Sequence, residues 1–171
     1  VDTARRYGRV YQTGAQRLSE PNHVFAIEMA RSGRLGPVQT VYADCRWRDG
    51  LRQDWLPAEP EPLKAELDWD LFLGPCPWRP YNRGYLSSGW YHFHDFATDV
   101  AMWGAQTVAQ ALAGLDMTKV TSIEFEYAGP DATMVTRLSN GVKLVLFRVT
   151  GSVWEPCQYW HGACGARFEG T

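Results

Sequence analysis

The chain has 171 residues, and 17 Lys and Arg against 19 Asp and Glu give it a formal net charge of -2 at pH 7. This length fits one domain with a sizeable core, and the scattered basic residues exclude an electrostatic footprint for nucleic acid or an anionic membrane. No apolar run approaches the roughly 20 residues that span a bilayer. The four cysteines are too widely spaced for a dense disulfide framework, so we expect free thiols at Cys45, Cys76, Cys157 and Cys164.

The first 47 residues alternate between helical and strand-like patterns. The expected elements are a helix over 2–7, a strand over 9–16, a helix from Ser19 to Gly33 and a strand over 36–47. Gly8 is typical of a helix C-terminus, Ser19 is a favoured N-cap and Pro21 suits a first helical turn. The order helix–strand–helix–strand indicates an α/β arrangement.

An aromatic-rich segment follows the proline-rich loop LPAEPEP (56–62), where prolines exclude regular structure. Residues 69–103 hold ten of the chain's 23 aromatic residues, interleaved with Pro and Gly. Such a segment is either a loop folded over the core or a wall for a ligand such as a sugar, whose C–H faces pack on rings. Composition alone favours the core-covering interpretation.

The stretch DFATDVAMWGAQTVAQALAGL (95–115) is expected to form a helix with two contrasting stripes. One stripe carries polar residues and a tryptophan at helical spacing: Asp99, Trp103, Gln106 and Gln110. The opposite stripe is small and apolar and should pack on the core: Val100, Gly104, Val108, Ala111 and Leu115. Two interpretations of the polar stripe are open, a solvated face or a face that points polar groups into a ligand pocket.

After residue 119 the hydrophobic period changes to two, which is typical of strands. Strands are expected over 119–128, 132–138, 142–149 and 158–168. Asn140-Gly141 is a strong hairpin signal between two of them. The predicted fold class is therefore α+β, an open and largely antiparallel sheet with one face covered by the 95–115 helix.

Motifs for phosphate binding and for a serine nucleophile are absent, since the sequence lacks G-x-G-x-x-G, G-x-x-x-x-G-K-[ST] and G-x-S-x-G. Cys157, His161 and Cys164 have a superficially zinc-like spacing, but only three ligands are local, and we predict no metal. His92 and His94 lack a third ligand and are more typical of packing or surface positions. Asp95, directly after them, is a candidate helix N-cap.

Four segments resemble the glucose–fructose oxidoreductase / inositol dehydrogenase (Gfo/Idh/MocA) family and occur in that family's order. LDWDLFLGPCPWRPYN (67–82) is similar to its L-D-W-D-x-W-L-G-P-A-P-x-R-P-Y-N segment. RVYQTGAQRLS (9–19) resembles its Q-x-G-x-Q-x-R-S strand and loop, and MARSGRLGPVQTVYA (29–43) resembles its G-x-I-G-x-V junction. CGARFEGT (164–171) resembles the strand that runs on into G-W.

The resemblance implies a two-domain enzyme, with a Rossmann domain that binds NAD or NADP and a C-terminal α/β domain that supplies most of the substrate pocket. Residues 1–36 would be the last helix–strand–helix of the dinucleotide-binding domain, and residues 37–171 most of the substrate-binding domain. The chain begins at Val1 without methionine or signal peptide and stops directly after a strand-like stretch. We therefore interpret it as an internal fragment, inactive alone, with the glycine-rich loop and the catalytic Lys of E-K-P upstream.

The resemblance also implies a set of site residues. Gln16 is expected to contact the cofactor. The expected substrate-binding residues are Arg17, Trp78, Arg79, Tyr81, Trp90, His94 and Trp103.

The family's proton acceptor is replaced in this chain. In the family, the helix matching 95–115 carries D-x-x-x-H, whose imidazole takes the substrate hydroxyl proton. The match of W-G-x-H to residues 103–106 puts Gln106 at the His position and Met102 at the Asp position. Gln106 can hydrogen-bond a hydroxyl but cannot take its proton. Asp99 is the candidate base on this helix, and the alternatives are His92, His94, Asp95 and the upstream Lys.

The resemblance implies an NAD(P)-dependent oxidoreductase acting on a sugar, polyol or sugar-like substrate. Two alternatives are a family member that only binds its ligand, and an NAD-dependent glycoside-cleaving or isomerising enzyme. The expected partners are a small carbohydrate-like molecule and a second copy paired through the C-terminal sheet, without nucleic acid or membrane. A cytoplasmic location is expected, with twin-arginine export of the full-length protein as the alternative.

Overall fold

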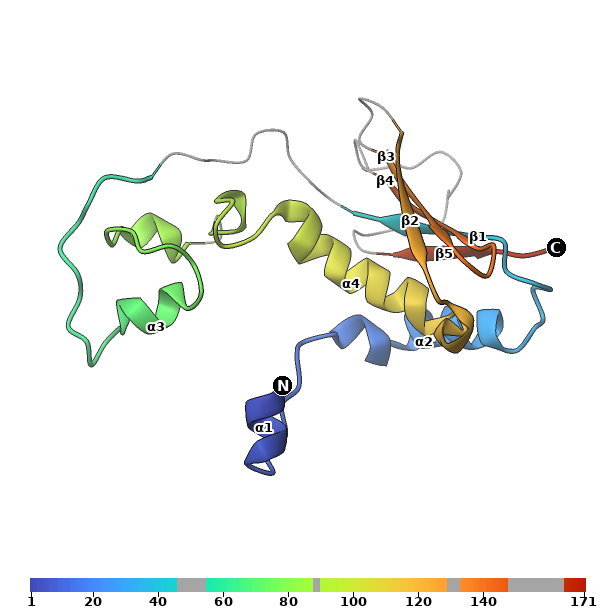
Figure 1. The fold of residues 1–171 in the computed structure, drawn as a ribbon, viewed down its shortest axis with the longest axis horizontal. Helices are drawn as coiled ribbons and strands as arrows, with labels where there is room; N and C mark the ends of the chain where they lie inside the picture. The colour runs from blue at the N-terminus through green and yellow to red at the C-terminus, as the bar shows by residue number, and fades with distance from the viewer. Residues whose placement is uncertain (46–54, 88–89, 129–132, 148–164) are drawn as a thin grey trace.

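The computed structural model describes residues 1–45, 55–87, 90–128, 133–147 and 165–171 (Figure 1). Its α-helices are α1 (Asp2–Arg6), α2 (Pro21–Arg31), α3 (Trp69–Leu73) and α4 (Asp99–Ala113). Its 3-10 helices are η1 (Gln16–Ser19), η2 (Arg83–Tyr85), η3 (Trp90–His92) and η4 (Met117–Lys119). Its strands are β1 (Thr40–Asp44), β2 (Ile123–Ala128), β3 (Thr133–Leu138), β4 (Lys143–Phe147) and β5 (Ala166–Glu169).

The described strands form one open sheet in the order β2-β3-β4-β1-β5. The β2–β3, β3–β4 and β1–β5 pairs are antiparallel, whereas β1 and β4 run parallel with Val41 opposite Leu144. The α4 and α2 helices lie on the same side of this sheet (Figure 1). The α+β class with an open, largely antiparallel sheet is therefore confirmed.

The hairpin predicted at Asn140-Gly141 joins β3 to β4. The backbone N–H of Gly141 donates to the carbonyl of Leu138 at 2.9 Å, and Gly141 has a φ of 91°. The Asn140 side-chain oxygen accepts from the backbone N–H of Val142 at 3.2 Å. A left-handed φ favours glycine, so the sequence signal and the turn geometry have the same cause.

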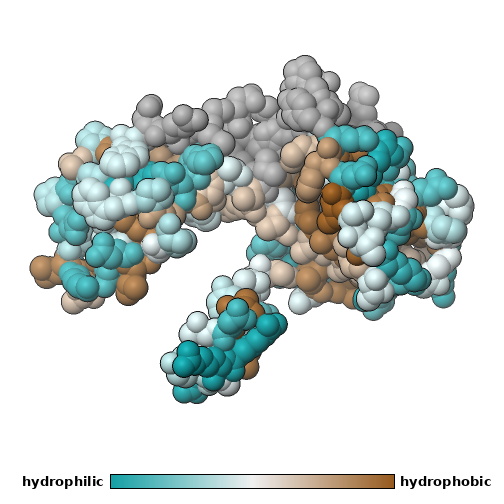
Figure 2. Space-filling view, viewed as in Figure 1, coloured by the Kyte–Doolittle hydropathy of each residue, from teal (hydrophilic) through white to brown (hydrophobic). Residues whose placement is uncertain are grey.

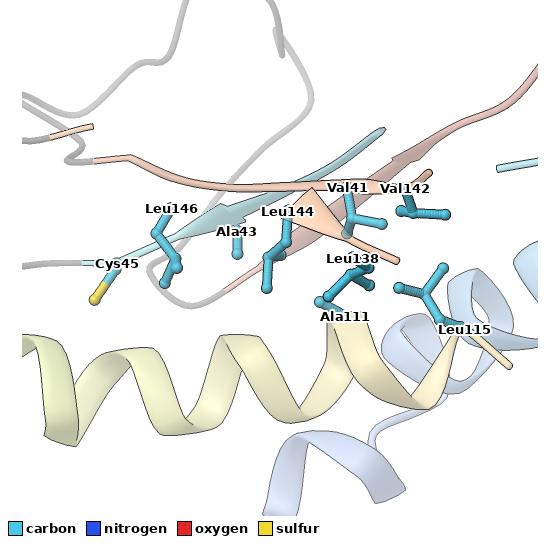
Figure 3. Close-up of a cluster of buried hydrophobic side chains, with 9 residues drawn as sticks. All are labelled: Val41, Ala43, Cys45, Ala111, Leu115, Leu138, Val142, Leu144 and Leu146. Carbon is cyan, nitrogen blue, oxygen red and sulfur yellow. The ribbon is translucent and has the colours of Figure 1, made fainter. Parts of the chain in front are cut away.

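The main core lies between the sheet and α4 (Figure 3). Alternate residues of β1 and β4 point towards the helix, because side chains of a strand alternate between its two faces. Ala111 of α4 and Leu115 just beyond it meet them from the helix side. The buried cluster comprises Val41, Ala43, Cys45, Ala111, Leu115, Leu138, Val142, Leu144 and Leu146.

The aromatic segment forms a second core of its own, beyond the N-terminal end of α4 (Figure 1). Trp69, Leu73, Tyr85 and Phe93 are buried together. The indole N–H of Trp69 donates to the carbonyl of Arg79 at 2.8 Å, which ties α3 to the loop after it. The aromatic rings therefore pack mainly against one another, and α4 rather than the aromatic segment covers the main core.

The strand predicted over residues 9–16 is wrong. Residues 9–15 are irregular, Gln16 already belongs to η1, and Val10 is 97% exposed. A strand needs a neighbour for its backbone hydrogen bonds, and no described strand lies beside this segment. The helix before it, α1, has no buried residue and stands apart from the rest of the molecule with a mostly hydrophilic surface (Figure 2).

Two predicted helix caps are displaced. The N-cap of α2 is Glu20 rather than Ser19, which ends η1, and Pro21 takes the first helical position. The N-cap of α4 is Thr98 rather than Asp95, and its hydroxyl accepts from the N–H of Ala101 at 2.9 Å. Thr98 and Asp95 are both favoured N-cap residues, so residue type did not separate them, whereas Ser19 is already part of η1.

Cys76 is a free thiol and Cys45 is buried in the main core, while Cys157 and Cys164 lie outside the described residues, as does the candidate zinc spacing with His161. In the part of the chain that the structure describes, no helix is long and apolar enough to cross a lipid bilayer. The same part contains no group of His, Cys, Asp and Glu residues that could hold a metal ion.

Replacing Gly114 with alanine should destabilise the protein. Gly114 is buried at the C-terminal end of α4 with φ -79°, a conformation open to alanine, but a Cβ there would overlap the ring of Phe168. Alanine is normally the better helix residue, yet overpacking should lower the free energy of unfolding by about 1–3 kcal/mol. Urea denaturation measures this, and Phe168→Leu in the Gly114→Ala background should recover part of the loss. A more stable Gly114→Ala variant would contradict the close approach.

Candidate functional site

The middle of α4 meets η1, which comes from the opposite end of the sequence. The side-chain N–H of Gln106 donates to the side-chain oxygen of Gln16 at 3.5 Å, across 90 residues of sequence. This hydrogen bond is long and therefore weak. It brings together the residue expected to contact the cofactor and the residue at the family's His position.

The polar stripe of α4 is only partly solvated. Gln110 is 2% exposed, and its side-chain N–H donates to the carbonyl of Gln106 at 3.0 Å. Thr107 is also buried, and its hydroxyl donates to the carbonyl of Asp44 on β1 at 2.6 Å. Polar groups of this helix are therefore turned inward, where each needs a hydrogen-bond partner.

One buried acceptor in this region lacks such a partner. The side-chain oxygen of Gln106 is enclosed, and no described residue donates to it. A buried carbonyl oxygen without a donor costs about 1–3 kcal/mol of stability. The Gln106 carboxamide is therefore satisfied through its N–H, which is directed to Gln16, and not through its oxygen.

Arg17, next to Gln16 on η1, is neutralised by a carboxylate. One guanidinium nitrogen of Arg17 donates to both oxygens of Glu20, at 2.9 and 2.7 Å. The Nε2 atom of His23 lies 3.2 Å from the same carboxylate. Arg17 and Glu20 are partly exposed, with side chains 32% and 42% accessible, so a ligand can still reach the pair.

Arg79 lies away from this contact, inside the aromatic core. Its side chain is 2% accessible and forms an ion pair with Asp95. Its guanidinium carbon lies 5.4 Å from the ring centres of Trp55 and Tyr85 and 5.1 Å from that of Phe96. Cation–π contacts and a carboxylate together stabilise a buried charge. This geometry gives Arg79 a structural role, and its predicted contact with substrate stays a prediction.

The remaining predicted residues divide between the two cores. Trp103 is half-buried against the main core, and Tyr81 against the aromatic one. Trp78 is 62% and Trp90 36% exposed on the aromatic segment. His94 is exposed, with Nδ1 3.8 Å from Asp95. The structure therefore brings together Gln16, Arg17, Gln106 and the helix that carries Trp103. The other predicted substrate-binding residues lie in the aromatic segment that precedes α4.

The candidate bases on this helix and just before it stay predictions. Asp99 is the first residue of α4, and its side chain lies outside the described part of the structure. Met102, at the family's Asp position, is half-buried and offers no charge. His92 ends η3 and is also half-buried.

A cleft of about 750 Å³ lies at the C-terminal end of α4, between α2, η4 and the β3–β4 hairpin. Its walls include Arg31, Leu112, Leu115 and Lys119, but neither Gln106 nor any predicted aromatic residue. The cleft is therefore distinct from the Gln16–Gln106 contact, and a ligand pocket walled by tryptophans around Gln106 stays a prediction.

Lowered carboxylate pKa values occur at structural positions. The backbone N–H of Leu71 and then the ammonium of Lys64 lower the pKa of Asp68, which caps α3. A hydrogen bond from Arg137 lowers the pKa of Glu126 and ties β2 to β3. Neither carboxylate belongs to the predicted site.

The sequence did not predict that Glu20 and Asp95 pair with the two arginines of the predicted site. Glu20 was expected only to begin a helix, although its spacing of three from Arg17 is that of a helical ion pair. Asp95 was considered as a cap or a base, and its pairing with Arg79 depends on how the aromatic segment folds. Only the first could have been found by spacing.

Searches against protein-family models and against curated proteins give no match to this chain.

Asp95→Asn should destabilise the aromatic segment strongly. The substitution leaves the Arg79 charge buried among three rings without its carboxylate, which should lower the free energy of unfolding by about 3 kcal/mol. Asp70→Asn, an exposed carboxylate of α3, is the matched control and should change stability by less than about 0.5 kcal/mol. Thermal and urea unfolding followed by tryptophan fluorescence would measure both. Equal effects of the two substitutions would contradict a buried ion pair.

Proposed function

We propose that this chain is part of an NAD(P)-dependent oxidoreductase similar to the Gfo/Idh/MocA family, acting on a sugar, polyol or sugar-like substrate. The observation that carries the proposal is the contact between Gln16 and Gln106. Sequence motifs that lie far apart assign the first to the cofactor and the second to the substrate. An enzyme that transfers hydride between substrate and cofactor needs its substrate-binding and cofactor-binding residues side by side.

The fold supports the same proposal. An open sheet with helices on one face agrees with the C-terminal domain that the resemblance implies. Residues 1–36 would complete the dinucleotide-binding domain and residues 37–171 would form most of the substrate-binding domain. The complete enzyme would supply the glycine-rich loop and the catalytic Lys from upstream sequence.

The described residues fit a nicotinamide cofactor in a limited way. Gln16 is exposed next to Gln106, and a carboxamide can exchange hydrogen bonds with the neutral amide or ribose hydroxyls of such a cofactor. NAD or NADP, when bound, supplies the hydride acceptor. Binding and orientation of the substrate hydroxyl then fall to Gln106, whose carboxamide can hydrogen-bond a hydroxyl.

Proton transfer has to be assigned to another group. A carboxamide binds a hydroxyl but does not take its proton, and Met102 supplies no charge. We assign the proton to the upstream Lys of the complete enzyme, with Asp99, His92 and His94 as the alternatives within this chain. A general base must lie within hydrogen-bond reach of its proton or one water away.

A second candidate function is ligand binding without dehydrogenase chemistry. The observation that favours it is the amide at the position of the family's proton acceptor. Binding of NAD(H) to the full-length protein, together with substrate-dependent reduction of free NAD, would separate the enzyme from the binding protein. Cleavage or isomerisation without net reduction would identify the glycoside-cleaving or isomerising alternative.

Partners and location are part of the same proposal. The sheet face opposite α4 carries Tyr42 and Phe147, whose ring centres lie 6.4 Å apart, and it is the face through which a second copy would pair. A cytoplasmic location is proposed, with twin-arginine export of the full-length protein as the alternative.

Gln106→Ala in the full-length enzyme should raise KM more than it lowers kcat. An amide binds a substrate hydroxyl in the ground state and the transition state alike, and loss of such uniform binding leaves kcat nearly unchanged. Steady-state kinetics with the best substrate of a sugar and polyol panel measures this.

The contrasting variants are Asp99→Asn and a substitution of the upstream Lys. Loss of a general base typically lowers kcat by about 10²–10⁴-fold. The large loss is expected for the Lys variant, and Asp99→Asn should keep most of the rate. Full activity of the Lys variant would contradict this assignment of the proton.

A further inference from the structure

We propose that the cleft at the C-terminal end of α4 is a binding site for a small carboxylic acid that carries an apolar group. The carboxylate would pair with Arg31, and the apolar group would pack on the main core. The cleft lies away from the Gln16–Gln106 contact, so this site does not depend on the proposed function. None of its lining residues is assigned to substrate or cofactor by the resemblance.

The cleft has the size and the apolar wall that small-molecule sites have. Its volume of about 750 Å³ lies within the roughly 300–1,000 Å³ typical of such sites. Leu115 and Val142 line it and belong to the main core, where they lie together at one end of the buried cluster (Figure 3). Val38 and Met117, which pack against the same core, also line it. An apolar ligand group in the cleft would therefore extend the main core, and burial of its surface would favour binding.

Three charged side chains line the cleft, and two of them neutralise each other. The Nζ atom of Lys119 lies 3.1 Å from a carboxylate oxygen of Asp116. Hydrogen bonds from the Thr118 hydroxyl and then from the Lys119 ammonium lower the pKa of Asp116, which keeps this carboxylate ionised and occupied. Arg31 is exposed and pairs with no carboxylate in the described part of the chain. The cleft therefore holds one unmatched positive charge.

Asn140 supplies a neutral donor from the β3–β4 hairpin, across the cleft from α2. Its side-chain oxygen accepts from the backbone N–H of Val142 at 3.2 Å, which leaves the amide N–H groups to donate. A carboxylate only accepts hydrogen bonds, and its two oxygens fit the planar fork of a guanidinium. One unmatched arginine balances the single charge of a carboxylate. A small acid with an apolar group thus matches the charge, the donors and the wall of the cleft.

The full-length protein is to be titrated at about pH 7, where carboxylic acids are ionised, with three probes that separate the two parts of this recognition. 4-Phenylbutyrate has both the carboxylate and the apolar group. 4-Phenylbutanamide keeps the apolar group without the charge, and acetate has the charge alone. Isothermal titration calorimetry gives the dissociation constants and needs no catalytic activity. A melting temperature that rises with probe concentration checks that the probe binds the native state.

4-Phenylbutyrate should bind at least about tenfold more tightly than the amide or acetate, because a charge-assisted hydrogen bond adds to apolar burial. Arg31→Gln should weaken binding of 4-phenylbutyrate about tenfold and change binding of the amide less than about twofold. Arg34→Gln, at an exposed arginine that does not line the cleft, is the matched control and should change neither affinity. Both variants should fold, because substitutions of exposed and unpaired side chains cost little.

A wall variant tests the apolar part of the site. Leu112 is half-buried and lines the cleft, and Leu112→Ala keeps a good helix-forming residue in α4. The smaller wall should weaken binding of 4-phenylbutyrate and of its amide by the same factor, about three- to tenfold. Arg31→Gln should instead affect only the acid, so the two variants separate charge recognition from apolar contact.

Four results would overturn this assignment of the cleft. These are absence of 4-phenylbutyrate binding at millimolar concentration, equal affinities for the acid and its amide, an unchanged acid affinity in a folded Arg31→Gln variant, and an unchanged acid affinity in a folded Leu112→Ala variant. An equal loss of acid binding in Arg34→Gln and Arg31→Gln would also contradict it, because it would show a general effect of surface charge.

Discussion

The close approach of α4 to the sheet is the constraint on which the rest of the structure depends. Gly114 lies directly against the ring of Phe168, and Ala111 is fully buried on the same side of the helix. Small residues at a contact allow a helix to lie near its neighbour, and interiors packed at this density leave little freedom to shift. The hydrogen bond from Thr107 to the carbonyl of Asp44 then fixes the position of the helix along β1.

This fixed helix determines where the polar chemistry lies. With Ala111 and Leu115 against the core, Gln106 is turned towards η1 and Gln110 is enclosed. The exposed 3-10 turn at Gln16 can meet the helix only because α2 follows it and packs on the same side of the sheet. The candidate site thus results from helix packing on a rigid scaffold, with the contacting residue supplied by a connecting segment.

The two arginines predicted as substrate ligands are both paired with carboxylates, but in different surroundings. Arg79 is buried with Asp95 among aromatic rings, where removal of either charge leaves the other without compensation. Arg17 and Glu20 form a second pair at the surface, where its contribution to stability is small. Ion pairing therefore stabilises the aromatic segment, whereas beside Gln16 it neutralises an exposed arginine.

The sequence by itself determined the elements whose signals are local. The strands at β2, β3 and β4, the Asn140-Gly141 turn and the amphipathic helix at α4 follow from spacing and turn chemistry, and the structure contains them. Most of the strand predicted over 158–168 lies outside the described residues. It did not determine the irregular state of residues 9–15, because a strand exists only with a neighbour to pair with. Only the tertiary structure decided that Gln106 meets Gln16 and that Asp95 neutralises Arg79. Such contacts join residues from separate segments, and no local pattern in the chain records which segments will pack together.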